Sequence, residues 1–127
     1  MNADDRTVGA IRATIANEIV KLQAEYYGKG PVKAKTYVLE DVVVVVLEES
    51  FTRAEKTLVE RGERESIQQI RRRFQQHMRD AFVGVVEQAT GRRVRTFLSE
   101  TDVDEDVSVE IFLLAEDRTD MSGFESA

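Results

Sequence analysis

A run of six apolar residues, VVVVVL at 42–47, constrains the fold of this chain more than any other segment. Five of the six are valines, whose β-branched side chains favour strands. The run is apolar on both faces of an extended backbone, which is typical of a strand buried on both sides. The acidic pair at 40–41 predicts a tight turn that joins the run to a preceding strand at 32–39. The two segments therefore form a predicted hairpin.

Apolar residues at helical spacing predict one long helix before the hairpin and another after it. Gly28 and Gly91 follow the two stripes at the position of a helix C′ glycine, where the left-handed backbone conformation costs glycine little. We expect every member of both stripes, the last tyrosine included, in the core. The first stripe is Val8, Ile11, Ile15, Ile19, Leu22 and Tyr26, and the second is Ile67, Ile70, Phe74, Met78, Ala81, Val85 and Ala89.

A short helix is predicted between the hairpin and the second long helix. Thr52 and Glu55 form a T-x-x-E capping box, which marks its start, and Gly62 stops or bends it. Two more strands, at 94–99 and 107–114, follow the second long helix and are separated by a polar acidic loop. The chain therefore closes with a second predicted hairpin.

These elements predict an α+β fold in the order α-β-β-α-α-β-β, with a four-stranded antiparallel sheet and helices on one face. Its 127 residues suit one domain, at 7–115, and we expect disordered tails at 1–6 and 116–127. Each half reads as helix, glycine, basic residues, strand, turn and strand, which indicates an α-β-β internal repeat. A second explanation of this similarity stays open: any α-β-β unit needs a glycine after its helix and apolar strands, whether or not it is a repeat.

The sheet face opposite the helices is predicted to be too apolar for exposure to water. Strand alternation puts Lys33 and Lys35 on that face, and we assign the second side of strand 107–114 to it as well. A sheet face that is exposed to solvent is normally polar, so we expect a second copy of the chain to cover this one as a homodimer. The apolar residues assigned to the face are Tyr37, Leu39, Phe97, Phe112 and Leu114.

Composition excludes several classes of protein. The absence of cysteine excludes disulfides, thiolate metal sites and cysteine nucleophiles. The polar, acidic N-terminal segment is unlike a signal peptide, and no apolar run approaches the roughly 20 residues that cross a bilayer. We therefore expect a cytoplasmic protein with no direct membrane insertion. The net charge of −6 disfavours nucleic-acid binding by the whole surface, although a local basic patch remains compatible with it.

No catalytic residue, metal site or cofactor is predicted. The acidic loop at 102–106 lacks the glycine and glutamate of a calcium-binding EF-hand, because Val107 and Leu113 occupy those positions. We interpret it as a solvated hairpin loop. His77, the only histidine, has no evident nucleophile beside it. The arginines at 71–73 point around their helix, and we expect them to pair with glutamates on a solvated face.

The segment EYYGKGPVKAKTY at 25–37 carries the candidate binding residues. Lys33 and Lys35 are about 7 Å apart on one strand face, and packing of the two halves as a symmetric pair would bring Arg93 and Arg95 near them. Such a patch suits a small anion, although lysines on an edge strand also serve solubility and edge protection. The candidate binding residues are Lys33, Lys35, Tyr37, Arg93 and Arg95, and the turn residues are Gly28, Gly30, Pro31, Gly62 and Gly91.

Four segments together resemble the bacterial MpsC-like family. They occur in the family's order, the resemblance runs from Val8 to Leu114, and only the acidic EES at 48–50 departs from the basic or glycine-rich loop expected there. The positions shared with the family's motifs are Gly28, Gly30, Pro31, Lys33, Lys35, Thr36, Tyr37, Glu55 and Arg93. The segments are EYYGKGPVKAKTY, FTRAEKTLVERG, RRRFQQHMRDAF and VEQATGRRVRTFLS.

The family is associated with a cation-translocating, membrane-potential-generating system that also relates to inorganic-carbon uptake. The resemblance therefore implies a soluble, non-catalytic accessory or regulatory subunit that docks on a membrane transport protein. It supplies no catalytic residues. The alternative is a binding module for a small anion or an RNA segment, with Tyr37 and Phe97 as stacking surfaces.

Overall fold

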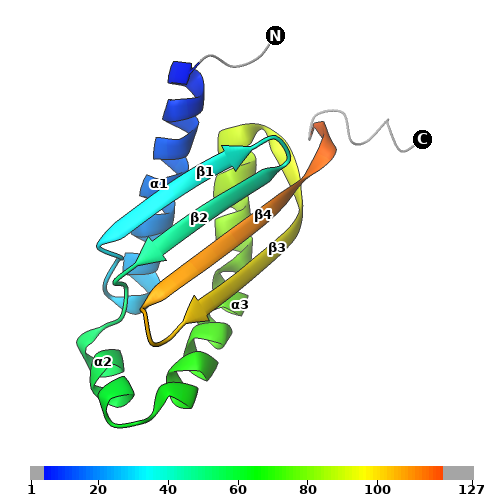
Figure 1. Cartoon of the computed structure of the whole chain (residues 1–127). Coiled ribbons are helices and arrows are strands. Elements are labelled where there is room, and N and C mark those ends of the chain that lie inside the picture. The colour runs from blue at the N-terminus through cyan, green and yellow to red at the C-terminus, as the bar shows by residue number, and fades with distance from the viewer. Residues whose placement is uncertain (1–4, 119–127) are drawn as a thin grey trace.

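The computed structural model describes residues 5–118 and has the four strands in one layer and the two long helices in another (Figure 1). The element order confirms the predicted α+β fold with an antiparallel sheet. In chain order the elements are α1 (Asp5–Tyr27), β1 (Lys33–Leu39), β2 (Val42–Glu48), α2 (Arg53–Glu60), α3 (Arg64–Thr90), β3 (Arg92–Asp102) and β4 (Val107–Arg118).

The two ends of the domain extend further than the sequence predicted. Helix α1 begins at Asp5, and strand β4 continues to Arg118. Residues 5–6 and 116–118 are therefore parts of regular elements, and placing them in disordered tails was wrong. The rest of those predicted tails, residues 1–4 and 119–127, lies outside the described residues.

The sheet has the strand order β1-β2-β4-β3, and every neighbouring pair is antiparallel. The order is symmetric about the contact between β2 and β4, so each α-β-β half contributes one hairpin, as a repeat of the two halves requires. Helices α1 and α3 lie together on one face of the sheet (Figure 1). No helix covers the other face within residues 5–118.

Strand β2, which contains the valine run, lies inside the sheet. Val43, Val45 and Leu47 are fully buried and point toward the helices. Val42, Val44 and Val46 point the other way and are only half-buried. The predicted strand is confirmed, but the helices cover only one of its two apolar faces.

Glycines end both long helices as predicted. Gly28 and Gly91 have φ values of +81° and +70°, and their N–H groups donate to Ala24 O and Glu87 O at 2.8 Å. A side chain would strain this left-handed conformation. Gly30 has a different role, because a Cβ there would lie 3.3 Å from the carbonyl oxygen of Val20. The turn before β1 therefore packs directly on α1.

The helix faces that pack on the sheet are rotated from those predicted. On α1, Tyr26 is 42% exposed, whereas Tyr27 packs against the core. On α3, Ile70 is 39% exposed, whereas Arg71 is 1% exposed. Both predictions of core side chains, Tyr26 and Ile70, were wrong. The buried positions of α3 are Ile67, Arg71, Met78, Phe82 and Val86, whereas Ala81, Val85 and Ala89 are only partly buried.

The assignment of Phe97, Phe112 and Leu114 to the face away from the helices was also wrong. Phe112 and Leu114 lie in the main core, and the Phe97 ring is 5.0 Å from the Phe112 ring between centroids. On β4, Phe112 pairs with Val43 of β2 and therefore shares its helix-facing side, as Leu114 does two residues later. On β3, the cause is an irregular register against β4 around Val94 and Thr96. A bulge changes which face later residues occupy, so Phe97 points toward the helices although Tyr37, its counterpart in the first half, does not.

We predict that Phe112→Ala destabilises the protein by about 3–5 kcal/mol, because it removes a fully buried aromatic ring from the core. Ile70→Ala, at an exposed position of α3, is the control and should cost about 1 kcal/mol or less. Urea unfolding followed by circular dichroism measures both. Equal losses for the two variants would contradict the revised assignment of the faces.

Candidate functional site

The predicted basic residues of the first half lie together on β1, an edge strand of the sheet. Lys33, Lys35 and Tyr37 are exposed on the face away from the helices. The Nζ of Lys35 is 5.3 Å from the centroid of the Tyr37 ring, which is cation–π range. Their predicted placement on one strand face is confirmed.

Arg93 and Arg95 do not join these residues. They are exposed on β3, which is the opposite edge of the sheet. Three strand spacings of about 4.8 Å separate the two edges by roughly 14 Å. Lys35 also shares its row with Glu100 of β3, and Arg95 is well removed from that row. The expected single patch of four cations was therefore wrong, and anion or RNA binding by Lys33, Lys35 and Tyr37 alone stays a prediction.

We call the sheet face away from the helices the open face. Its side chains form four rows across the sheet. Strand pairing places one residue of each strand in every row, and most of the members are apolar. The rows are Leu39, Val42, Leu113 and Thr96; Tyr37, Val44, Ile111 and Leu98; Lys35, Val46, Val109 and Glu100; and Lys33, Glu48, Val107 and Asp102.

The charges of the open face are divided between its two edges. Lys33 and Lys35 lie on β1, whereas Glu100 and Asp102 lie on β3 in the same two rows. Glu48 is the one charged side chain on the two inner strands of these rows, and it pairs with Lys33 in the last row. The open face is thus apolar in the middle, and in its last two rows it is basic along β1 and acidic along β3.

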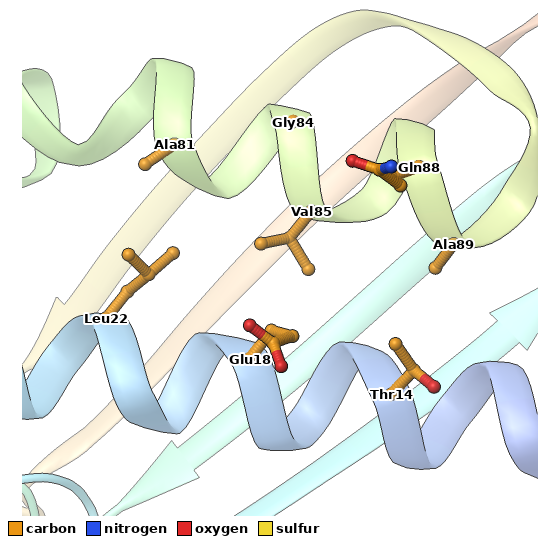
Figure 2. Close-up of a pocket in the computed structure, with 8 residues that line it drawn as sticks. All are labelled: Thr14, Glu18, Leu22, Ala81, Gly84, Val85, Gln88 and Ala89. Atoms are coloured by element: carbon orange, nitrogen blue, oxygen red, sulfur yellow. The ribbon is translucent and has the colours of Figure 1, made fainter.

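A groove of about 530 Å³ runs between α1 and α3 on the side of the helices away from the sheet (Figure 2). Small side chains on α3 keep it open, including Ala81 and Gly84. Leu22 and Val85 form its floor, and Glu18 is its charged member. The groove brings together neither a nucleophile and a base nor a group of cations.

The buried charge centre of the molecule is Arg71, whose side chain is 1% exposed. Its Nε donates to Glu55 Oε2 at 2.8 Å and its Nη2 to Glu55 Oε1 at 2.6 Å. Ser50 accepts two further bonds through its hydroxyl and its carbonyl oxygen. The guanidinium carbon lies 4.0 Å from the centroid of the Tyr27 ring and 4.8 Å from that of Phe51. The expectation that Arg71 is solvated was wrong.

The Arg71 centre depends on the capping box that the sequence predicted. Thr52 Oγ1 accepts from Glu55 N at 3.1 Å, and Glu55 Oε1 accepts from Thr52 N at 2.9 Å. The same carboxylate therefore starts α2 and neutralises the arginine of α3. The sequence carries a signal for this role, because Arg71 is four residues after Ile67 and seven before Met78, in step with the buried face of α3.

The acidic loop between β3 and β4 is structural rather than fully solvated. Asp106, at a φ of +55°, accepts the backbone N–H groups of Ser50 and Phe51 at 3.0 and 3.1 Å. Val103 is buried in a second small core with Phe51 and Ile67. The loop thus holds the segment between β2 and α2, and the expectation of a purely solvated loop was wrong.

The chain matches a protein family and resembles a curated protein over most of its length. The model of a family described as "Na+-translocating membrane potential-generating system (MpsC)" matches residues 7–116. The chain belongs to the MpsC family. It is also 27% identical over 115 residues to "Uncharacterized protein YbcI" of Bacillus subtilis (strain 168), which covers 88% of this chain and 91% of that protein. No solved structure matches it.

Two further observations bear on what this MpsC-family chain can do. None of the helices within residues 5–118 is long and apolar enough to cross a membrane. Among the same residues, no three or more histidine, aspartate and glutamate side chains are placed to hold a metal ion. His77 is exposed on α3. The expectations that this chain is not an enzyme and that it takes no cofactor stay predictions.

A buried carboxyl group lies beneath the sheet of the MpsC-family chain. Glu110 of β4 is fully buried, and neither carboxylate oxygen has a hydrogen-bond partner among the described residues. Burial raises the pKa of Glu110 to about 7, and the neighbouring Ser99 hydroxyl and the Arg71 charge lower it only in part. Burial also raises the pKa of the Tyr27 hydroxyl, against the influence of Arg71. The helix side of the sheet therefore contains a carboxyl group that titrates near neutral pH.

We predict that Glu55→Gln destabilises the protein by about 3–5 kcal/mol, since it leaves the Arg71 charge buried without a counter-ion. Asp104→Asn is the matched control. Asp104 also holds an arginine, Arg64, through two hydrogen bonds, but both side chains are more than half exposed. Its loss should cost about 1 kcal/mol or less. Thermal and urea unfolding measure the difference, and similar losses would contradict a structural role for the buried pair.

We predict that Glu110→Gln removes a pH dependence of stability. With its pKa raised from 4.5 to about 7, Glu110 holds a proton in the folded state that the unfolded chain has lost. The wild type therefore loses stability as the pH rises from about 4.5 to about 7. The free energy of unfolding of Glu110→Gln, minus that of the wild type, should grow by roughly 3 kcal/mol across this window.

Urea unfolding of both proteins at pH 4.5, 6 and 8 measures this change. Glu60→Gln, at an exposed position of α2 away from the sheet, is the control and should differ from the wild type by about 0.5 kcal/mol or less at each pH. A pH-independent difference for Glu110→Gln as well would show that Glu110 does not titrate near neutral pH.

Proposed function

We propose that this MpsC-family chain is a non-catalytic accessory or regulatory subunit of a membrane system that translocates ions and sets the membrane potential. The observation that carries the proposal is the family match, which spans residues 7–116 and therefore nearly all of the described domain. The chain would act from the cytoplasmic side through a protein partner. The predicted relation to inorganic-carbon uptake is a further part of the same proposal.

The arrangement of polar groups supports a non-catalytic role. The buried ion pair of Glu55 and Arg71 is held by hydrogen bonds between the two side chains and by bonds to backbone groups of Thr52 and Ser50. General acid–base catalysis needs a group that reaches the substrate, and a carboxylate locked against a buried arginine does not. By contrast, the open face and the interhelical groove are extended surfaces of the kind that bind proteins.

The proposal predicts a change in membrane potential when the protein is removed from a bacterium that makes it. Deletion of the gene should lower the Na+-dependent part of the membrane potential, measured with a potential-sensitive dye, and the wild-type chain should restore it. His77→Ala should restore it equally, because the only histidine is exposed on α3 and has no catalytic role in this proposal.

Two outcomes would count against the proposal in different ways. An unchanged Na+-dependent potential in the deletion strain would overturn the link to ion translocation. Failure of a folded, normally abundant His77→Ala variant to restore the potential would point to chemistry at the histidine and overturn the non-catalytic role.

A further inference from the structure

We propose that the open face binds the same face of a second copy of this chain, across a two-fold axis that runs parallel to the strands. This inference is independent of the proposed function, because it rests on the sheet alone. The helices cover one face of the sheet, and the second apolar face of the valine run in β2 is left without a covering layer within residues 5–118.

The apolar part of the open face is continuous. It occupies the whole of the second row and most of the first. It continues along both inner strands in the third row, at Val46 and Val109, and along β4 into the last row at Val107. Leu39 is 61% exposed, Leu98 is 53% exposed and Tyr37 is 41% exposed. A face of this composition is unusual for the water-exposed side of an antiparallel sheet and is typical of a surface that associates.

The charges at the two edges of the open face indicate that a second copy of the chain covers it. A two-fold axis along the strands exchanges the two edges of the sheet while it keeps each row at its own level. Lys35 therefore opposes Glu100 of the second copy, and Lys33 opposes Asp102 of the second copy. Each contact occurs twice because of the symmetry, so four ion pairs flank the last two rows of the interface.

Other symmetric arrangements lack this match. An axis in the plane of the sheet but perpendicular to the strands would place β1 on β1 and reverse the order of the rows. Lys35 would then oppose Tyr37, and Lys33 would oppose Leu39. Both axes keep the strands of the two sheets aligned, as in face-to-face sandwiches, so the match of charges is what favours the axis along the strands. Glu48 then lies in the last row, at the rim, beside Lys33.

The size of the face suits a dimer of moderate strength. Four strands about 4.8 Å apart and four rows about 6.7 Å apart cover roughly 19 Å by 27 Å, or about 500 Å² from each copy. The total of about 1,000 Å² is near the lower limit of stable protein interfaces. We therefore expect association that depends on protein concentration.

Sedimentation velocity of the full chain, from 1 to 200 µM in low salt, tests the proposal. The wild type should be a dimer at the upper concentrations. Lys35→Glu alone and Glu100→Lys alone should each raise the dimer dissociation constant by about tenfold, because each creates two like-charge contacts. The combination of Lys35→Glu with Glu100→Lys should restore the wild-type constant to within about threefold.

Matched controls separate this interface from general charge effects. Lys56→Glu and Glu60→Lys change the same charges on exposed positions of α2 and should leave the dissociation constant unchanged. Leu98→Lys, at an exposed position in the middle of the face, should give a monomer with an unchanged circular dichroism spectrum. A monomeric wild type at 200 µM would overturn the proposal.

A dimer that is insensitive to the single reversals, or one that the double variant does not restore, would overturn the predicted axis and its charge pairing. A monomeric wild type that still restores the membrane potential in the deletion strain would leave the proposed function standing. The failure of one inference is therefore distinguishable from the failure of the other.

Discussion

The buried contact between Arg71 and Glu55 is the interaction on which the rest of the structure depends. The carboxylate that begins α2 through its capping box is also the counter-ion of the arginine in α3. Tyr27, the last residue of α1, packs its ring on the guanidinium. Ser50, in the segment between β2 and α2, accepts two hydrogen bonds from the guanidinium. One charged side chain thus joins four segments, and the loss of either partner would leave an uncompensated charge in the interior.

The sequence was sufficient for the elements and their order, because local signals determine both. Helical spacing, the capping box and the glycines after the long helices each correspond to features of the structure. The side of each helix that faces the core was harder to predict. Arg71 was interpreted as a surface residue because it is charged, although its spacing from Ile67 and Met78 follows the buried face. The neighbouring Ile70 was assigned to the core for the opposite reason and is exposed.

The second half of the sheet shows why a repeat in the sequence does not fix the facing of a strand. The similarity of Lys35–Val38 and Arg95–Leu98 predicts equivalent positions for Tyr37 and Phe97. A register irregularity at Val94 shifts the alternation by one residue, and no local sequence signal marks it. The prediction of a single basic patch was wrong for a related reason. The strand order places β1 and β3 at opposite edges of the sheet, and the sequence alone did not reveal that order.

The two sides of the sheet have an unusual distribution of polarity that connects stability with association. The buried side contains a row with Thr36, Glu110 and Ser99, whereas the open side of the adjacent row carries Tyr37 and Leu98 among valine and isoleucine. A monomer would gain from the opposite arrangement, because burial penalises Glu110 and exposure wastes the apolar surface. Covering the open face would remove the exposed apolar surface from water and would leave the burial of Glu110 unchanged. The valine run, apolar on both sides, is then accounted for by helices on one face and a second chain on the other.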